Sequence, residues 1–452
     1  RTTWEELVLP GDASGYWGSG LTGDAGEGVN RIAALDLPRE PILSLGHLRH
    51  APTARFIHQP LLSIGESTAG PLVSPNFVYN LTRFSESGDT VFNRRELGLT
   101  FLGWQTVADW PYLSNEGLWD AAFFSGIAPE PAAGRDLETV LTEFVEDGEP
   151  LAQARTRLIP GEGAVLQTAL AGGSPTAESW SLPAQTTLGA GLLNVNSTSP
   201  AAWEALLHST LNVDVPVVGD SGSASAQSGG DPAFPRQLHP VEAGSTPTSD
   251  WQSYRRLRES EIEALAEELV AQIRARGPFT SLADFVNRAL VDDPDTSEDE
   301  RLAGSLQAAM DAVGLNSFST VMTDFIEGTP LHNFRLPGYR ERLDYPFPEH
   351  LRGDGDGLLR HNVTQYLTQG DLLQAIGPAL AARSDTFRIR VYGESRSATG
   401  GVAAKVRADA IVQRMPEPAQ PDADQASEPA DPEFMGRRFK IIALHWIDAE
   451  PF

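Results

Sequence analysis

Residues 367–378, LTQGDLLQAIGP, and the nearby residues 383–394, RSDTFRIRVYGE, decide the fold class of this chain. The first stretch is interrupted by Gly377-Pro378 and predicts a helix over residues 372–382 that breaks or restarts at that dipeptide. The second stretch alternates apolar and polar residues, a period of two that predicts a half-buried antiparallel strand over residues 387–392. A helix that runs directly into such a strand favours a fold containing both helices and an antiparallel sheet.

The alternating pattern returns twice after this strand. Residues 402–413 and 439–446 show the same period and predict two more strands. Gly400-Gly401 predicts a hairpin between the first two. We therefore expect an α+β protein whose antiparallel sheet uses these C-terminal strands and one or two strands from the first half of the chain.

The strongest helical periodicity lies before this region. Apolar residues recur at intervals of three and four from Ile262 to Ile273, with glutamates on the other face, and Gly277-Pro278 ends the helix. Ser281 predicts the N-cap of a second helix, and residues 301–313 predict a third. A further helix over residues 199–211 is expected to be capped by Ser199 and to turn Trp203 inward.

Composition limits the classes of function that this chain can have. Its 452 residues carry 34 basic and 61 acidic side chains, a net charge of −27, which disfavours binding to nucleic acid. It contains no cysteine, so disulfides, thiol catalysis and cysteine zinc sites are excluded. No apolar window of about 18 residues is present to span a bilayer. Because the chain opens on Arg1 rather than Met, we expect any leader to lie upstream.

The length and the Gly- and Pro-rich stretches predict several domains. We expect an extended arm over residues 1–40 and a mixed α/β region over 41–190 that contributes to the sheet. A helical, helix-hairpin-helix-like domain is expected over 191–382, with a linker at 219–250. The C-terminal β region is expected over 383–452, with a disordered Pro/Asp/Glu/Ala insert at 416–432.

Several segments in a fixed order resemble a known group of proteins. They are PREPILSLGHL (38–48), LSNEGLWDAAFFS (113–125), LLNVNSTS (192–199), GPFTSLADFVNR (277–288) and GRRFKII (436–442). Together with the stretches quoted first, they resemble the Verru_Chthon cassette protein A group of pilin-like proteins. The layout is more distantly similar to the large minor pseudopilin K of type II secretion, in which a helical domain interrupts a pilin-like sheet.

This resemblance implies a function without catalysis. It implies a minor pilin-like or pseudopilin-like subunit at the tip or initiation point of a bacterial cell-envelope filament or secretion system. The partners would be other pilin-like subunits, and the membrane would be reached only through an apolar N-terminal helix upstream of Arg1. The alternative is a surface adhesin or carbohydrate-binding protein. Exposed coplanar tryptophan side chains would favour the adhesin. Burial of Trp110, Trp119, Trp203 and Trp446 in cores would favour the pilin-like scaffold.

Two acidic loops are candidates for calcium. One carries Asp292, Asp293, Asp295 and Glu298, and the other is an Asp-x-Asp-Gly start, with Asp354 and Asp356, that lacks the distal Glu of a calcium loop. The resemblance to pseudopilin K, which uses calcium, adds to this hypothesis. The alternative is a solvated run of charge, and in the first loop the acids would also suit the N-terminus of the helix at Arg301.

Three other patterns favour ordinary structural roles. Residues 65–70, GESTAG, fail the nucleophile-elbow pattern because Ala69 stands where the second Gly is needed. His47, His50 and His58 lie close together, but Gly46 and Pro52 disfavour the helix that would align two metal ligands. The acidic neighbours of the helix-hairpin-helix pattern favour packing over DNA binding. We expect no catalytic residues and no cofactor other than calcium.

Overall fold

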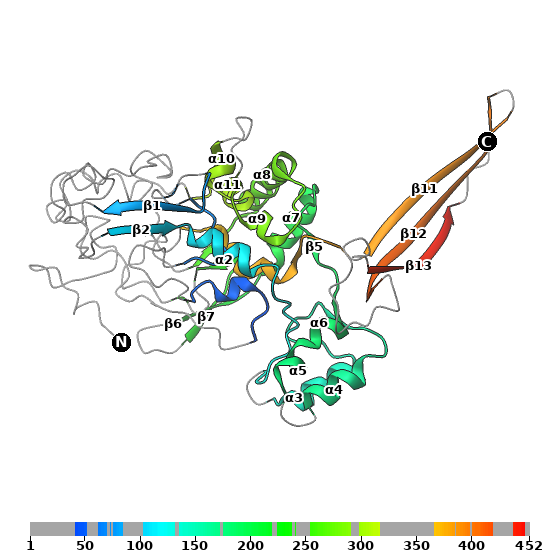
Figure 1. Cartoon of the computed structure of the whole chain (residues 1–452), viewed down its shortest axis with the longest axis horizontal. Coiled ribbons are helices and arrows are strands. Elements are labelled where there is room, and N and C mark those ends of the chain that lie inside the picture. The colour runs from blue at the N-terminus through cyan, green and yellow to red at the C-terminus, as the bar shows by residue number, and fades with distance from the viewer. Residues whose placement is uncertain are drawn as a thin grey trace, which may run out of the picture. The chain divides into compact units, whose positions relative to one another are not determined.

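The computed structural model describes residues 41–51, 62–69, 73, 76–84, 103–131, 135–171, 175–218, 224–236, 240, 254–290, 298–316, 366–384, 386–397, 400–418 and 437–447. The described residues form helices and small, mostly antiparallel sheets (Figure 1), so the α+β class is confirmed. No helix among them is long and apolar enough to cross a membrane. The chain divides into two compact units, and the boundary between them in the sequence lies between Ala382 and Arg383.

The first unit holds all the helices of the described part of the chain. The α-helices are α2 (Trp110–Leu118), α3 (Leu137–Thr142), α4 (Gly163–Ala171), α5 (Ala177–Ser181), α6 (Pro183–Thr186), α7 (Pro200–Leu207), α8 (Glu259–Arg276), α9 (Leu282–Val286), α10 (Glu298–Leu302), α11 (Ser305–Ala312) and α14 (Gln369–Ile376). Short 3-10 or π turns are η2 (Leu45–Leu48), η3 (Glu143–Asp147), η4 (His208–Thr210) and η7 (Gly377–Ala379).

The strands of the first unit pair only two at a time among the described residues. They are β1 (Tyr79–Phe84) with β2 (Gly103–Ala108), β3 (Thr156–Leu158) with β4 (Thr187–Gly189), β5 (Leu193–Asn194) with β10 (Leu380–Ala381), β6 (Val215–Val218) with β7 (Ala224–Gln227), and β8 (Ala233–Pro235) with β9 (Tyr254–Arg256). Only the β5–β10 pair is parallel.

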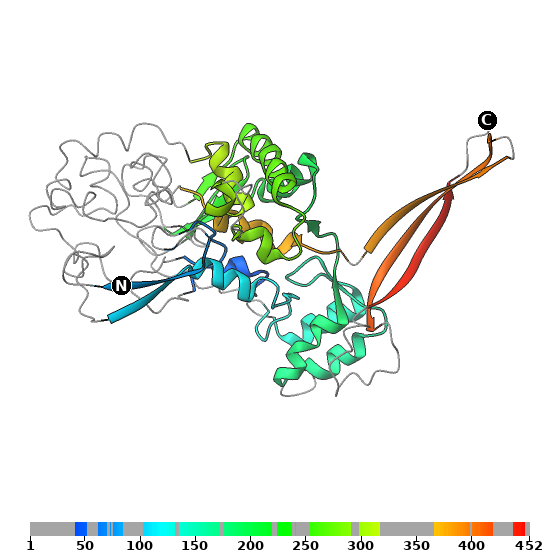
Figure 2. The same ribbon diagram turned by 45° about the horizontal axis from the view of Figure 1, so that its top comes forward.

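The main core surrounds α8, which packs beside α7 and α11 (Figure 2). Its inward residues from Ile262 to Ile273 are buried, as the spacing predicted. Trp203 on α7 is completely buried and stacks on Phe285 of α9 with ring centroids 5.8 Å apart. Ser281 caps α9 by accepting a hydrogen bond from the Asp284 backbone N–H at 3.0 Å. These predictions are confirmed.

Segments from the first half of the chain enter this same core. Leu45, Ile64 and Trp119 are buried in one cluster with the residues of α8 and α14. We expected one or two first-half strands to join the C-terminal sheet, but the described strands β1 and β2 pair with each other. The strand expected at residues 97–102 lies outside the described residues. The domain limits proposed from sequence therefore stay predictions.

Three helix and linker predictions need correction. The helix expected over residues 301–313 is two helices, α10 and α11, separated at Gly304. The helix expected over 372–382 is α14, which begins at Gln369 and ends at Ile376. The turn η7 and the strand β10 follow it. The stretch expected as a linker over 219–250 contains β7 and β8, since Phe234 is fully buried in the main core and anchors this part of the chain.

The second unit is a three-stranded antiparallel sheet in the order β11 (Thr386–Arg396), β12 (Val402–Pro418), β13 (Arg437–Ile447). The hairpin expected at Gly400-Gly401 is present, with Gly400 in the left-handed region at φ +86°. All three predicted strands are confirmed. Pro416 to Pro418, which we expected in the disordered insert, belong to β12, where Pro418 lies opposite Arg437.

Candidate functional site

Of the residues proposed for calcium, only Glu298 lies in the part of the chain that the structure describes. Asp292, Asp293, Asp295, Asp354 and Asp356 lie outside the described residues, while Glu298 is the first residue of α10. Among the described residues, no group of three His, Asp or Glu side chains is arranged to hold a metal ion. Calcium binding by these loops stays a prediction.

The histidine and serine patterns have structural roles where they are described. The His50 ring, through Nε2, makes a 2.8 Å hydrogen bond to the Arg236 carbonyl oxygen, and the side chain is buried. Ser67 is buried too, and its hydroxyl accepts a 2.9 Å hydrogen bond from the Gly304 backbone N–H. His58 lies outside the described residues. These contacts fit a turn and a hydrogen-bonded histidine.

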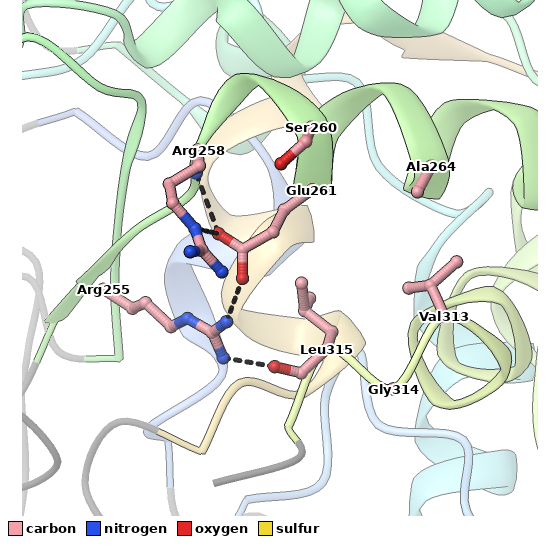
Figure 3. A pocket seen from close by; sticks show the side chains of 8 residues that line it. All are labelled: Arg255, Arg258, Ser260, Glu261, Ala264, Val313, Gly314 and Leu315. Carbon is pink, nitrogen blue, oxygen red and sulfur yellow. Dashed lines mark hydrogen bonds and ion pairs between the residues drawn. The ribbon is translucent and has the colours of Figure 1, made fainter. Parts of the chain in front are cut away.

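A shallow pocket of about 260 Å³ lies beside the N-terminus of α8 (Figure 3). Its charged groups contact one another: Arg255 donates to Glu261 at 2.5 Å, and Arg258 donates to the same side chain through its backbone N–H at 2.9 Å and through Nε at 3.3 Å. Burial would raise the pKa of Glu261, but the hydrogen bonds from Arg258 and the charge of Arg255 outweigh it and lower that pKa. The pocket's ionised groups therefore bind each other.

The C-terminal sheet has one apolar face, which is the candidate functional surface. Directly opposite residues of an antiparallel sheet lie on the same face. The register places three rows across the strands on this face: Phe387–Val412–Ile441, Ile389–Ala410–Leu444 and Val391–Ala408–Trp446. In each row the side chain on the central strand is the smallest. We call these nine residues the apolar face.

Most of this apolar face is exposed to solvent. Trp446 is 67% exposed, Ile441 63% and Val391 50%, whereas Ala408 on the central strand is 2% exposed. At one end Phe387 packs against Phe439, with ring centroids 6.2 Å apart. We predicted a half-buried strand, but this apolar side is uncovered by the described residues. Contiguous exposed apolar surface of this kind marks a contact site.

The opposite face of the sheet is polar and strongly paired. Arg390 donates to Asp409 through Nε at 2.7 Å, and Arg407 lies 5.8 Å from the Tyr392 ring centroid. The hydroxyl of Tyr392 donates to Glu394 at 2.7 Å, and hydrogen bonds from Tyr392 and Arg396 lower the pKa of Glu394. We call this the basic face, since its exposed charged groups are mainly cations.

Sequence reasoning identified the strands but missed this surface. The alternation predicted which residues share a face, yet it could not tell whether that face is covered. In residues 402–413 the apolar positions of the alternating pattern are alanine and valine, whereas those in 387–392 and 439–446 include Phe, Ile, Leu and Trp. This difference was the available signal that the central strand carries smaller side chains than its neighbours. Comparison with protein-family models, curated proteins and solved structures found no match to this chain.

Proposed function

We propose that this protein is a non-enzymatic subunit of a cell-envelope filament or secretion system, of the minor pilin or pseudopilin type. The observation that carries the proposal is the exposed apolar face, because a subunit of this type packs a long apolar helix against an antiparallel sheet. The segments quoted above resemble the pilin-like Verru_Chthon cassette protein A group, and they motivate the same assignment.

The dimensions of the apolar face suit one helix. The apolar face covers five residues of β11, Phe387 to Val391, which span about 16 Å at about 3.3 Å per residue. A helix covering that length needs about 11 residues at 1.5 Å rise. Small side chains on β12, between bulky ones on β11 and β13, leave room for a convex rod along the middle of the sheet. A single apolar helix fits this profile better than a flat second sheet.

The tryptophans support the scaffold over the adhesin. Trp119 and Trp203 are buried, and Trp110 is partly buried. Trp446 is exposed, but its neighbours in the register, Ala408 and Leu444, are aliphatic and offer no hydrogen bonds to a sugar. A glycan-binding platform would combine coplanar aromatic rings with polar groups.

The first test is the N-terminal sequence of the protein in its native source, as precursor and as mature chain. We expect a basic leader that is cleaved before an apolar helix of about 20 residues. An ordinary secretory signal, or no apolar helix upstream of Arg1, would sink the pilin-type assignment and favour the adhesin.

A matched pair of variants tests the apolar face itself. Ala410→Trp fills the middle of that face, while Ala164→Trp adds the same bulk to an exposed position of α4. We expect Ala410→Trp to remove the protein from the native filament or envelope fraction and Ala164→Trp to leave it there. Equal recovery of both variants would contradict the role of the apolar face.

A further inference from the structure

The C-terminal sheet reverses the charge of the rest of the chain. Its three strands carry nine basic and three acidic residues, whereas the whole chain has 34 basic and 61 acidic ones. The basic residues are spread along three segments of the sequence. The register places Arg390, Lys405, Arg407 and Lys440 on the side of the sheet opposite the apolar face, whereas Arg414 lies opposite Phe439 on the apolar side.

The acidic residues on this side are covered by the basic ones. The Asp409 side chain is 8% exposed under Arg390, which is 64% exposed. Glu394 is likewise less exposed than Arg396, its partner at 2.6 Å. Arg407 and Lys440 are exposed on the same face, as the register with Tyr392 and Gln413 shows. The surface offered to a partner is therefore cationic.

We propose that the basic face docks on the acidic outer face of α8 of a second copy of this chain, in a head-to-tail contact. Glu259, Glu263 and Glu267 lie at successive positions i, i+4 and i+8 and are exposed. Glu259 lies in the first turn of α8, where the helix dipole favours an acid, and it makes a 2.8 Å hydrogen bond with His208 Nε2. Like charges one turn apart destabilise a helix, so Glu263 and Glu267 are not explained by the stability of α8. This contact would join copies of the chain within the proposed filament. It rests on the proposed function, because that function is the reason to expect several copies in one assembly.

The spacings and charges of the two surfaces match. Carboxylates four residues apart on a helix are separated by about 6 Å along its axis. Alternate residues on a strand are separated by about 6.6 Å, so a row of glutamates can lie over a row of arginines and lysines. A heterologous contact between two different surfaces of one chain generates a ring or an open helical assembly.

The test is sedimentation velocity of the full chain at about 100 and about 500 mM salt, with Debye lengths of about 10 and 4 Å. We expect concentration-dependent association at the lower salt that falls at least tenfold at the higher salt. Arg407→Glu with Lys440→Glu should give monomers, and so should Glu263→Lys with Glu267→Lys. Mixing these two double variants should restore association with both variants present in equal amounts, because the reversed charges complement each other.

The controls separate this contact from folding and from the apolar face. Arg157→Glu makes the same charge change as Lys440→Glu on an exposed residue of β3 and should associate like the parent chain. Ala410→Trp, which tests the helix-binding role, should also associate normally. If charge-driven association fails while Ala410→Trp still blocks filament incorporation, only the head-to-tail contact is wrong.

Two outcomes would overturn the proposal. One is a parent chain that stays monomeric at about 100 μM protein and 100 mM salt. The other combines two results. The parent chain binds vesicles of phosphatidylglycerol or a single-stranded oligonucleotide, and Arg407→Glu with Lys440→Glu abolishes that binding, while the mixed double variants do not associate. That result would assign the basic face to a polyanion.

Discussion

At the scale of single residues, the first unit is organised by buried polar side chains. Arg49 is completely buried and donates to Glu66 at 2.7 Å, to Thr368 at 3.2 Å and to Asp371. Thr368 donates to the same Glu66 oxygen at 2.7 Å, and its backbone N–H donates to Asp371 at 2.7 Å. A buried charge is tolerated only when it is paired and hydrogen-bonded. The cluster therefore ties the N-terminal segment to the start of α14.

Glu66 gives this cluster a pH dependence. Burial raises the pKa of Glu66, and the charge of Arg49 opposes but does not cancel that effect. The folded protein therefore binds this proton more tightly than the unfolded chain. The stabilisation that comes from protonating Glu66 is fully present below the ordinary pKa of 4.5. It is lost as pH rises through the pKa of Glu66 in the folded protein.

We predict that Glu66→Gln removes this dependence. Urea unfolding from pH 4.5 to 8 should show the parent chain gaining stability relative to Glu66→Gln as pH falls. Glu178→Gln is a control that should show no such trend over this range, because a hydrogen bond from Thr176 lowers the pKa of Glu178 and its effect lies below pH 4.5. Parallel stability curves for the parent and Glu66→Gln would contradict the assignment.

A second buried side chain, Asn115, joins three segments. Its Oδ1 accepts from the Gly65 backbone N–H at 2.8 Å and from Trp119 Nε1 at 3.0 Å. Its Nδ2 donates to the Glu66 carbonyl at 2.7 Å and to Asn287 Oδ1 at 2.9 Å. Every hydrogen-bonding position of this amide is therefore used in the core.

We predict that Asn115→Ala lowers the free energy of unfolding by about 2–4 kcal/mol, because buried donors and acceptors lose their partners. Gln185→Ala, which removes an exposed amide from α6, should change it by less than about 0.5 kcal/mol. Chemical denaturation of both variants measures the difference. A loss below about 1 kcal/mol for Asn115→Ala would show that water or repacking replaces these bonds.

At the scale of secondary-structure elements, close packing rather than helix propensity decides where helices end. Residues 301–313 have the apolar spacing of one helix, yet the helix is interrupted at Gly304. A Cβ atom at this position would collide with the Val286 carbonyl oxygen at the end of α9. The Gly304 backbone N–H instead donates to Ser67. The break brings α11 against α9 and the segment around Ser67.

We predict that Gly304→Ala destabilises the protein by about 1–3 kcal/mol, since its methyl group meets backbone rather than a movable side chain. Gly117→Ala is the matched control, because a Cβ there meets nothing within 4 Å and α2 gains helix propensity. Thermal unfolding should therefore move in opposite directions for the two variants. Equal shifts would mean that the contact at Val286 relaxes easily.

At the scale of the whole molecule, the two units differ in how they are stabilised. The first buries a continuous cluster of apolar residues around α8. In the second, only Ala408 and Asp409 are buried among the side chains described. Removing apolar surface from water is the main favourable term in folding, and this sheet leaves most of its apolar face exposed. The C-terminal sheet is therefore the weaker unit until a partner covers that face.

We predict that amides of β11 and β13 exchange with solvent at least about 100-fold faster than those of α8, a difference of about 2.7 kcal/mol in opening free energy. Native-state hydrogen exchange followed by mass spectrometry measures both. Covering the apolar face in the assembled filament should slow exchange in β11 and β13 and leave α8 unchanged. Equal protection of the sheet and α8 in the isolated chain would contradict this account.

The sequence alone predicted the elements whose pattern is strong and local. The period of two gave the three C-terminal strands, and the heptad-like spacing with Gly277-Pro278 gave α8 and its end, because one covered face of a regular element imposes its own repeat. Capping by Ser281 and the inward Trp203 were equally local. The calcium loops and the resemblance to pilin-like proteins stay predictions, since no described residue tests them.

Tertiary structure alone decided the contacts between distant segments. The buried partners of Arg49 and Asn115, the break at Gly304 and the strands within the expected linker depend on residues far apart in the chain. The two faces of the C-terminal sheet were decided in the same way. Alternation states which residues lie together, but only the strand register places small side chains between large ones and brings Arg390, Arg407 and Lys440 to one side. Burial and exposure are properties of the packed molecule, and a single segment does not contain them.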